Sequence, residues 1–201
     1  LIVNDPAYRR RLMLSMLTEE PDAYLAQLQA AKLNDDVEVA HYAATAVAQI
    51  SKESDLKLQQ LERAFKTDPS AQNLNEYCDF LGEYLCSGLA EGRVAQIQRQ
   101  QYARLLARRC EREDTLELRI RYATALADVG QIDEAQAVTD QLVIDVPEEQ
   151  EVWMLCLRLA VMRRDGDEVH RVIDAIDKQH VYLSADNREK LAFWRDGEEA
   201  R

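Results

Sequence analysis

Glycine and proline are scarce in this sequence, with six glycines and four prolines among 201 residues. Because these two residues mark most turns, their scarcity predicts long helices joined by few loops. No segment approaches the roughly 20 consecutive apolar residues of a membrane-spanning helix, and there is no signal peptide. The first residue is Leu1 rather than Met, so we expect a piece of a longer protein, whose membrane anchor could lie upstream.

Motifs that carry catalysis or bind cofactors are also missing. The sequence has no glycine-rich phosphate or dinucleotide loop, no His-Glu-x-x-His and no Gly-x-Ser-x-Gly. Asp167 and His170 are three residues apart on a predicted helix, but no further metal ligand converges on them in the sequence. His41 falls at a position where a packing aromatic is usual. We therefore expect no catalytic residue, no metal and no cofactor.

Positive charge and paired cysteines are in short supply as well. The net charge of −12 disfavours nucleic acid or an anionic membrane surface as the main partner. The four cysteines include no Cys-x-x-Cys pair. Cys78 and Cys86 lie on one predicted helix, separated by about 12 Å of helical rise, which is too far for a disulfide. We expect buried, reduced thiols.

What the sequence does contain is clearest between residues 115 and 147, where two apolar stripes at helical spacing flank one glycine. Gly130 is expected to end the first helix in a left-handed conformation, and Pro147 closes the unit. Counted from Leu116, small residues and turn formers occupy positions 8, 15, 20 and 32 of the tetratricopeptide (TPR) pattern: Ala123, Gly130, Ala135 and Pro147. Such a hairpin needs neighbours stacked on it.

The rest of the chain supplies helical signals for these neighbours. The predicted fold is all-α, with antiparallel hairpins stacked into a TPR-like right-handed solenoid over residues 1–195 and a polar tail at 196–201. The hairpins are expected at about 5–33, 35–68, 71–111, 115–146 and 149–180. The second has helices at 37–50 and 54–67, and the third has two helices longer than the pattern needs. The last turn is expected at 165–167. A capping helix at 185–195 could close the stack with Leu191, Phe193 and Trp194.

If these are TPR hairpins, the first helix of each lines a concave surface suited to a peptide or a partner helix. The pattern positions predict the partner-binding residues Tyr42, Glu76, Phe80, Glu83, Glu117, Thr124, Met154 and Arg158. The alternative is that Tyr42, Phe80 and Met154 are buried between helices. A basic ridge for an acidic partner is a second candidate surface, formed by Arg99, Arg104, Arg108, Arg109 and Arg112. These arginines could instead pair with Glu111, Glu113 and Asp114.

Residues 34–43, NDDVEVAHYA, also resemble a more specific family, together with NDPAYRRRLMLSML before them and LKLQQLERAF after them. The stretch resembles the TPR protein of Pel exopolysaccharide loci, the PelE-like family. The similarity covers most of the chain and is strongest over residues 4–65. It implies a cytoplasmic repeat domain attached to the bacterial inner membrane by an upstream segment. The implied partners are the cyclic-di-GMP receptor PelD and other Pel synthase components.

The three arginines at positions 9–11 fit a positive cluster just inside a membrane, although a solvated helix face is the other interpretation.

Three functional classes follow from the whole sequence. A protein-interaction scaffold in exopolysaccharide synthesis is favoured over a small-molecule or nucleotide sensor, which would need a closed apolar cavity near the third hairpin. An enzyme is the third class and is not expected. Self-association through the long third hairpin stays open.

Overall fold

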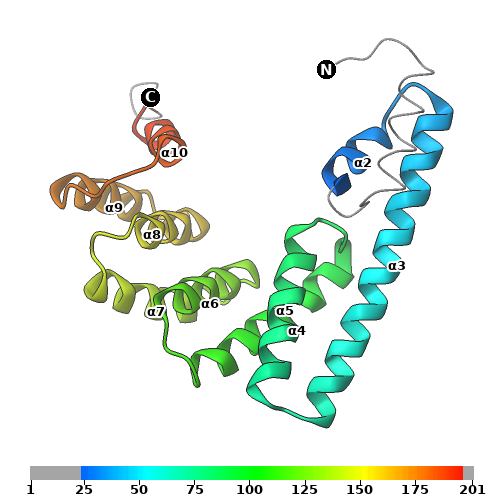
Figure 1. Ribbon diagram of the computed structural model, residues 1–201. Helices are drawn as coiled ribbons and strands as arrows, with labels where there is room; N and C mark the ends of the chain where they lie inside the picture. Colours follow the sequence, from blue (N-terminus) through cyan, green and yellow to red (C-terminus); the bar gives the residue numbers. More distant parts are fainter. Residues whose placement is uncertain (1–23, 197–201) are drawn as a thin grey trace. The chain divides into compact units, whose positions relative to one another are not determined.

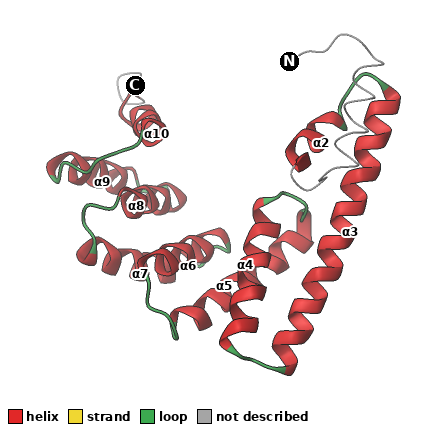
Figure 2. Cartoon of the chain, viewed as in Figure 1, coloured by secondary structure: helices red, strands yellow, loops and turns green. Residues whose placement is uncertain are grey.

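The computed structural model describes residues 24–196, and every element in this range is a helix (Figure 1, Figure 2). The prediction of an all-α fold is therefore confirmed over these residues. The predicted helix at 5–20, the arginine cluster at 9–11 and residues 197–201 of the tail lie outside them. Within 24–196, no helix is both long enough and apolar enough to cross a membrane.

The chain divides into two compact units, residues 1–98 and 99–201. The N-terminal unit contains α2 (Leu25–Ala31), α3 (Val37–Thr67), α4 (Ala71–Cys86) and the start of α5 (Gly92–Cys110). The C-terminal unit contains the rest of α5, α6 (Leu116–Asp128), α7 (Ile132–Asp145), α8 (Gln150–Arg163), α9 (Gly166–Lys178) and α10 (Ala185–Asp196). A single solenoid running through both units stays a prediction.

Helix α3 corrects the prediction for the second hairpin. It runs unbroken over 31 residues, so the turn expected between residues 50 and 54 is wrong. The sequence there, SKES, contains neither glycine nor proline, and the Gln49 side-chain amide donates to Glu53 one turn further on. Nothing in this stretch therefore interrupts helical hydrogen bonding. The start of α3 is capped, because the Asp36 carboxylate accepts from the backbone N–H groups of Glu38 and Val39.

The two halves of α3 pack on different neighbours. Its N-terminal half forms a buried cluster with α2, made of Leu28, Val39, Ala43, Ala46 and Ile50. Its C-terminal half contacts α4, where the rings of Phe65 and Tyr77 lie 6.3 Å apart. Helices α2 and α4 therefore both pack on the same long helix, α3.

Helices α6 to α10 pack in sequence within the C-terminal unit. Each of α6, α7 and α8 contacts the next helix, and α6 also contacts α8. One buried cluster joins α6, α7 and α8 through Ala123, Leu126, Ala127, Ala135, Leu155 and Leu159. Ala123 and Ala135 are fully buried, as expected for small residues that allow close helix approach. A second cluster joins α8, α9 and α10. Of the predicted capping residues, Leu191 is buried and Trp194 half-buried, but Phe193 is exposed.

The helices of this unit repeat with a 34-residue register. Helices α6 and α8 begin at Leu116 and Gln150, and α7 and α9 begin at Ile132 and Gly166, so each pair is offset by 34 residues. These four helices occupy the positions predicted for the hairpins at 115–146 and 149–180. In Figure 1 α6 and α7 lie beneath α8 and α9. The spacing equals that of TPR units.

The turns between these helices repeat with the same register. Gly130 (φ 80°) and Arg164 (φ 58°) both adopt the left-handed conformation, Gly130 two residues after the end of α6 and Arg164 directly after α8. The next residue then donates its N–H to a carbonyl five residues back, from Gln131 to Leu126 and from Asp165 to Ala160. This is the Schellman pattern that satisfies the last carbonyls of a helix. The prediction of a shifted turn at 165–167 is therefore wrong, because Arg164 takes the position of the glycine and residue 166 already belongs to α9.

Candidate partner-binding surfaces

Four predicted partner-binding residues lie in the N-terminal unit. Tyr42 is exposed on the N-terminal half of the unbroken α3, rather than on the first helix of a hairpin. Glu76 and Glu83 are exposed on α4, and Phe80 is half-buried there. The alternative of burial between helices is therefore wrong for Tyr42 and partly right for Phe80. These positions remain accessible, as a contact surface requires.

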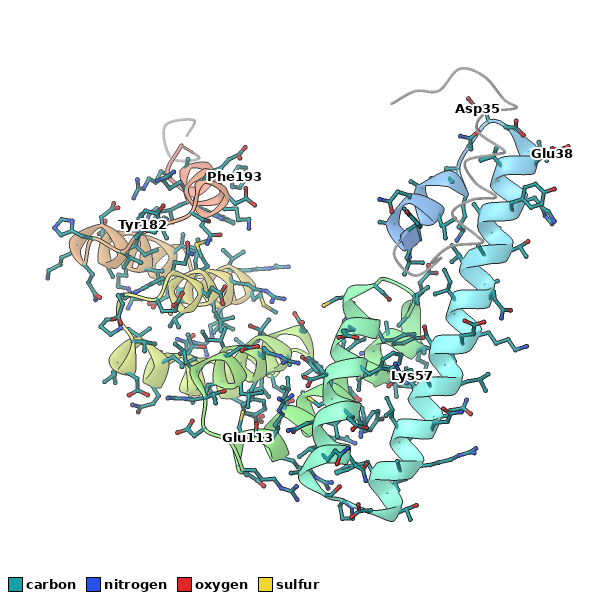
Figure 3. The ribbon with its side chains drawn as sticks, in the orientation of Figure 1. Asp35, Glu38, Lys57, Glu113, Tyr182 and Phe193 are labelled. Carbon is teal, nitrogen blue, oxygen red and sulfur yellow. The ribbon has the colours of Figure 1, made fainter. Side chains whose placement is uncertain are left out.

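Phe80 is covered by a cation that sequence reasoning missed. The Lys57 ammonium of α3 lies 4.3 Å from the centroid of the Phe80 ring, on the side of α3 that faces α4 (Figure 3). This cation–π contact joins two helices, α3 and α4. No spacing pattern could have indicated it, because the two residues belong to different elements.

A second contact between α3 and α4 is a hydrogen bond from a tyrosine hydroxyl to a carboxylate. The Tyr84 hydroxyl donates to Asp55 Oδ1 at 2.8 Å. Burial, and then the hydrogen bond to Asp55, raise the pKa of Tyr84 to about 12. The hydroxyl is therefore a hydrogen-bond donor at neutral pH, and it fixes the α4 face that presents Phe80.

The other four predicted residues lie in the C-terminal unit. Glu117 and Arg158 are exposed on α6 and α8, and Thr124 is half-buried. Met154 is half-buried and packs against the cluster that joins α8 to α10, so the alternative of burial between helices is partly right for this residue. Because α6 and α8 contact each other, these residues come from neighbouring helices of one unit.

Ion pairs between helices fix the register of α6, α7 and α8. Arg158 pairs with Asp128 at the end of α6, and Arg163 pairs with Asp133 at the start of α7, at 2.8 Å. Arg119 of α6 lies 2.6 Å from Asp145 at the end of α7. The hydrogen bond from Arg119 holds the pKa of Asp145 below its ordinary value. Solvent screens each of these exposed pairs, so each contributes little alone, but together they favour one alignment.

The predicted basic ridge is mostly solvent-exposed. Arg99, Arg104, Arg108 and Arg112 are exposed, whereas Arg109 is half-buried with its Nε 3.6 Å from Glu113 Oε2. Pairing with the acidic residues that follow α5 therefore accounts for Arg109. Arg99 and Arg104 form no hydrogen bond or ion pair with any side chain between residues 24 and 196.

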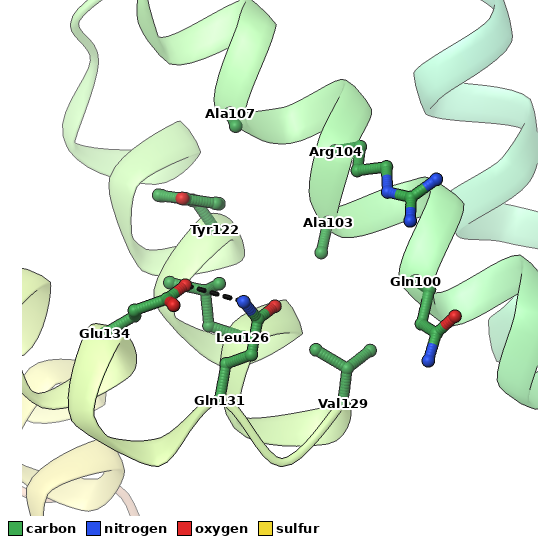
Figure 4. A pocket seen from close by; sticks show the side chains of 9 residues that line it. All are labelled: Gln100, Ala103, Arg104, Ala107, Tyr122, Leu126, Val129, Gln131 and Glu134. Carbon is green, nitrogen blue, oxygen red and sulfur yellow. Dashed lines mark hydrogen bonds between the residues drawn. The ribbon is translucent and has the colours of Figure 1, made fainter.

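A hollow of about 350 Å³ lies beside this ridge, within the C-terminal unit (Figure 4). Its lining comes from α5 on one side and from α6, the following turn and α7 on the other: Gln100, Ala103, Arg104, Ala107, Tyr122, Leu126, Val129, Gln131 and Glu134. The Gln131 amide donates to Glu134 Oε2 at 2.7 Å, on the side opposite Arg104. The hollow therefore combines an apolar lining with one cation and one anion.

Tyr122 supplies the aromatic part of that lining. Burial and the nearby Glu134 carboxylate raise the pKa of Tyr122, so its hydroxyl stays protonated at neutral pH. Tyr102 of α5 accepts a hydrogen bond from Arg121 Nη2 at 2.8 Å, which links α5 to α6. The elements that border the hollow are thus tied together by side-chain contacts.

Metal-ligating and thiol groups are scattered over the described part of the chain. Residues 24–196 contain no group of three or more His, Cys, Asp or Glu side chains placed to hold a metal ion. All four cysteines are free. Cys78 and Cys156 are buried, but Cys86 is exposed and Cys110 only half-buried, so the expectation of burial is wrong for these two.

Three comparisons with known proteins found no match to this chain. No protein-family model matches the chain, and no curated protein or solved structure is similar to it. The functional argument therefore depends on the residues and their arrangement.

Proposed function

We propose that this protein is a non-catalytic scaffold that binds other proteins through TPR-like helical repeats. The 34-residue register of α6 to α9 carries the proposal, because helix starts, left-handed turns and carbonyl caps all repeat with it. Repeats of this kind stack in series and present extended surfaces for partners. A right-handed solenoid of stacked hairpins is the arrangement we propose for the C-terminal unit.

The proposed cellular role is more specific. Residues 34–43 and their flanking segments support a role as the cytoplasmic domain of an inner-membrane protein that assembles a Pel exopolysaccharide synthesis and secretion complex. The proposed partners are the cyclic-di-GMP receptor PelD and other Pel synthase components. In this proposal an upstream segment provides the membrane attachment, and the described helices provide the binding surfaces.

A small-molecule or nucleotide sensor is the alternative function. The hollow beside α5 lies at the third predicted hairpin, where a sensor site was expected. A sensor would need a closed apolar cavity, whereas this hollow carries Arg104, Glu134 and two glutamines. Such a mixture suits a side chain of a protein partner better, so the scaffold remains the preferred proposal.

A matched pair of variants tests the scaffold. Arg158→Glu and Arg163→Glu make the same charge change on α8, and each removes one exposed ion pair to an aspartate of the preceding helices. Only Arg158 occupies a predicted partner-binding position. We expect Arg158→Glu to lower recovery of PelD from solubilised membranes of the encoding bacterium about tenfold, which corresponds to about 1.4 kcal/mol of binding. Arg163→Glu should behave like the unaltered chain.

The outcomes separate two parts of the proposal. PelD is detected by immunoblot, and circular dichroism confirms that both variants fold. If the folded, unaltered chain recovers no Pel component, the Pel role is wrong. If both variants lose PelD equally, the predicted concave surface is wrong, because the loss then reflects charge alone.

A further inference from the structure

Charge is sharply segregated between two helices of the C-terminal unit. Residues 99–110 of α5 contain four arginines and no acidic residue, whereas residues 132–151 contain seven acidic residues and no lysine or arginine. The second segment covers α7, the loop after it and the start of α8. In a chain of net charge −12, an unbalanced basic helix beside an acidic one requires an explanation.

Two of the four acidic groups of α7 pair with arginines, whereas Glu134 and Asp140 have no cation among the described residues. Asp133 pairs with Arg163 and Asp145 with Arg119. Asp140 is exposed and, among the described residues, accepts a hydrogen bond only from the neutral Gln136 amide, at 2.7 Å. Arg104 of α5 is in the complementary situation, exposed and without an ion pair to any described residue.

Apolar residues lie close to both charged groups, Asp140 and Arg104. Ile144, one helical turn from Asp140, is 73% exposed. Beside Arg104, the hollow is lined by Ala103 and Leu126, which are at most 5% exposed, and by the half-buried Ala107. Ile144 and Asp140 are one turn apart on α7, about 6 Å along the axis, and Ala107 and Arg104 are less than one turn apart on α5. Glu134 does not obstruct the pairing, because it lies across the hollow from Arg104 and is held by Gln131 (Figure 4).

We propose that the hollow beside α5 binds α7 of a second copy of this chain, with Ile144 in the hollow and Asp140 paired with Arg104. The contact is heterologous, because the two surfaces that meet are different parts of the molecule. Each copy in a dimer therefore keeps one unused surface. Repulsion between two acidic chains is screened beyond about 8 Å at physiological ionic strength, so the local complementary pair decides the orientation.

Complementation between two variants of the purified protein tests the proposal. Arg104→Glu disables the hollow and leaves α7 intact, whereas Ile144→Asp disables α7 and leaves the hollow intact. By sedimentation velocity up to about 500 µM, a range that detects weak transient contacts, the unaltered chain should associate and each variant alone should remain monomeric. A mixture of the two variants should form a 1:1 complex that grows no further, because only one competent surface of each kind remains.

Met162→Asp is the matched control, since Met162 is also an exposed apolar residue of this unit, on α8. This variant should associate like the unaltered chain. The inference is overturned by a monomeric unaltered chain, by variants that still associate alone, or by a mixture that fails to form the complex. If the unaltered chain is monomeric and Arg104→Glu abolishes recovery of PelD, an acidic segment of another protein occupies the ridge in place of a second copy. That last outcome leaves the proposed scaffold function standing.

Discussion

Replacing Arg164 by glycine should stabilise the C-terminal unit, although it removes an entire side chain. Arg164 holds a left-handed backbone conformation (φ 58°) at the turn between α8 and α9. Its side chain is exposed and makes no hydrogen bond or ion pair with any residue from 24 to 196. The substitution therefore changes backbone strain and little else. Gly130, 34 residues earlier, gives the reverse experiment at the equivalent turn.

The magnitude follows from two opposing terms. A left-handed conformation costs an L-residue about 1–2 kcal/mol, and glycine loses about 0.5–1 kcal/mol more conformational entropy on folding. Arg164→Gly should therefore raise the free energy of unfolding by about 0.5–1 kcal/mol, and Gly130→Ala should lower it by a similar amount. A Cβ at Gly130 would have no heavy atom within 4 Å, so no steric clash adds to the second value.

Urea unfolding followed by tryptophan fluorescence measures both changes. Both tryptophans, Trp153 and Trp194, lie in the C-terminal unit, so the signal reports on the unit that contains both turns. Arg164→Ala is the control, because it removes the guanidinium but keeps the strained L-residue. If Arg164→Gly is no more stable than Arg164→Ala, backbone strain at this turn is not the cause and the reasoning fails.

Two further predictions concern titratable groups. The Tyr84 pKa of about 12 exceeds the unfolded value of about 10, so its contribution to stability is complete below pH 10 and is lost as the pH rises towards 12. Urea midpoints of Tyr84→Phe should therefore fall less over this range than those of the unaltered chain, and parallel falls would contradict the role of the bond to Asp55. Among the cysteines, exposed Cys86 should react first with Ellman's reagent, whereas Cys78 and Cys156 should react only on unfolding, because both are buried and burial raises the pKa of Cys156 to about 12. Cys86→Ser should remove the fast phase, and its survival in that variant would show that the assignment is wrong.

Local signals predicted the helices of the C-terminal unit well. A glycine that can be left-handed ends α6, and buried alanines mark the close approach of α6 and α7. The sequence predicted two helices within α3 from a repeat count, but no residue in SKES ends a helix. The turn at Arg164 was missed for the opposite reason. Arginine carries a Cβ that disfavours the left-handed region, so the local sequence gives no sign that residue 164 adopts it.

The candidate surfaces were predictable only in part. Periodicity identified positions that are accessible in the structure, such as Tyr42, Glu76 and Arg158. It could not identify Lys57 over Phe80 or Asp128 beside Arg158, because these pairs join residues far apart in the sequence. Such contacts depend on helix packing and side-chain rotamers, which a single sequence does not specify.

The unbroken α3 also limits how this protein can vary in length. A helix of 31 residues is about 46 Å long, and its two halves pack against different helices, α2 and α4. Inserting one residue between Ile50 and Leu58 would rotate one face by about 100° relative to the other and pull one cluster out of contact. An insertion of seven residues would restore the phase to within about 20°. Related chains should therefore differ in this region by numbers of residues that keep the helical phase, such as about 7, 11 or 18, or not at all, while loop insertions elsewhere remain tolerable.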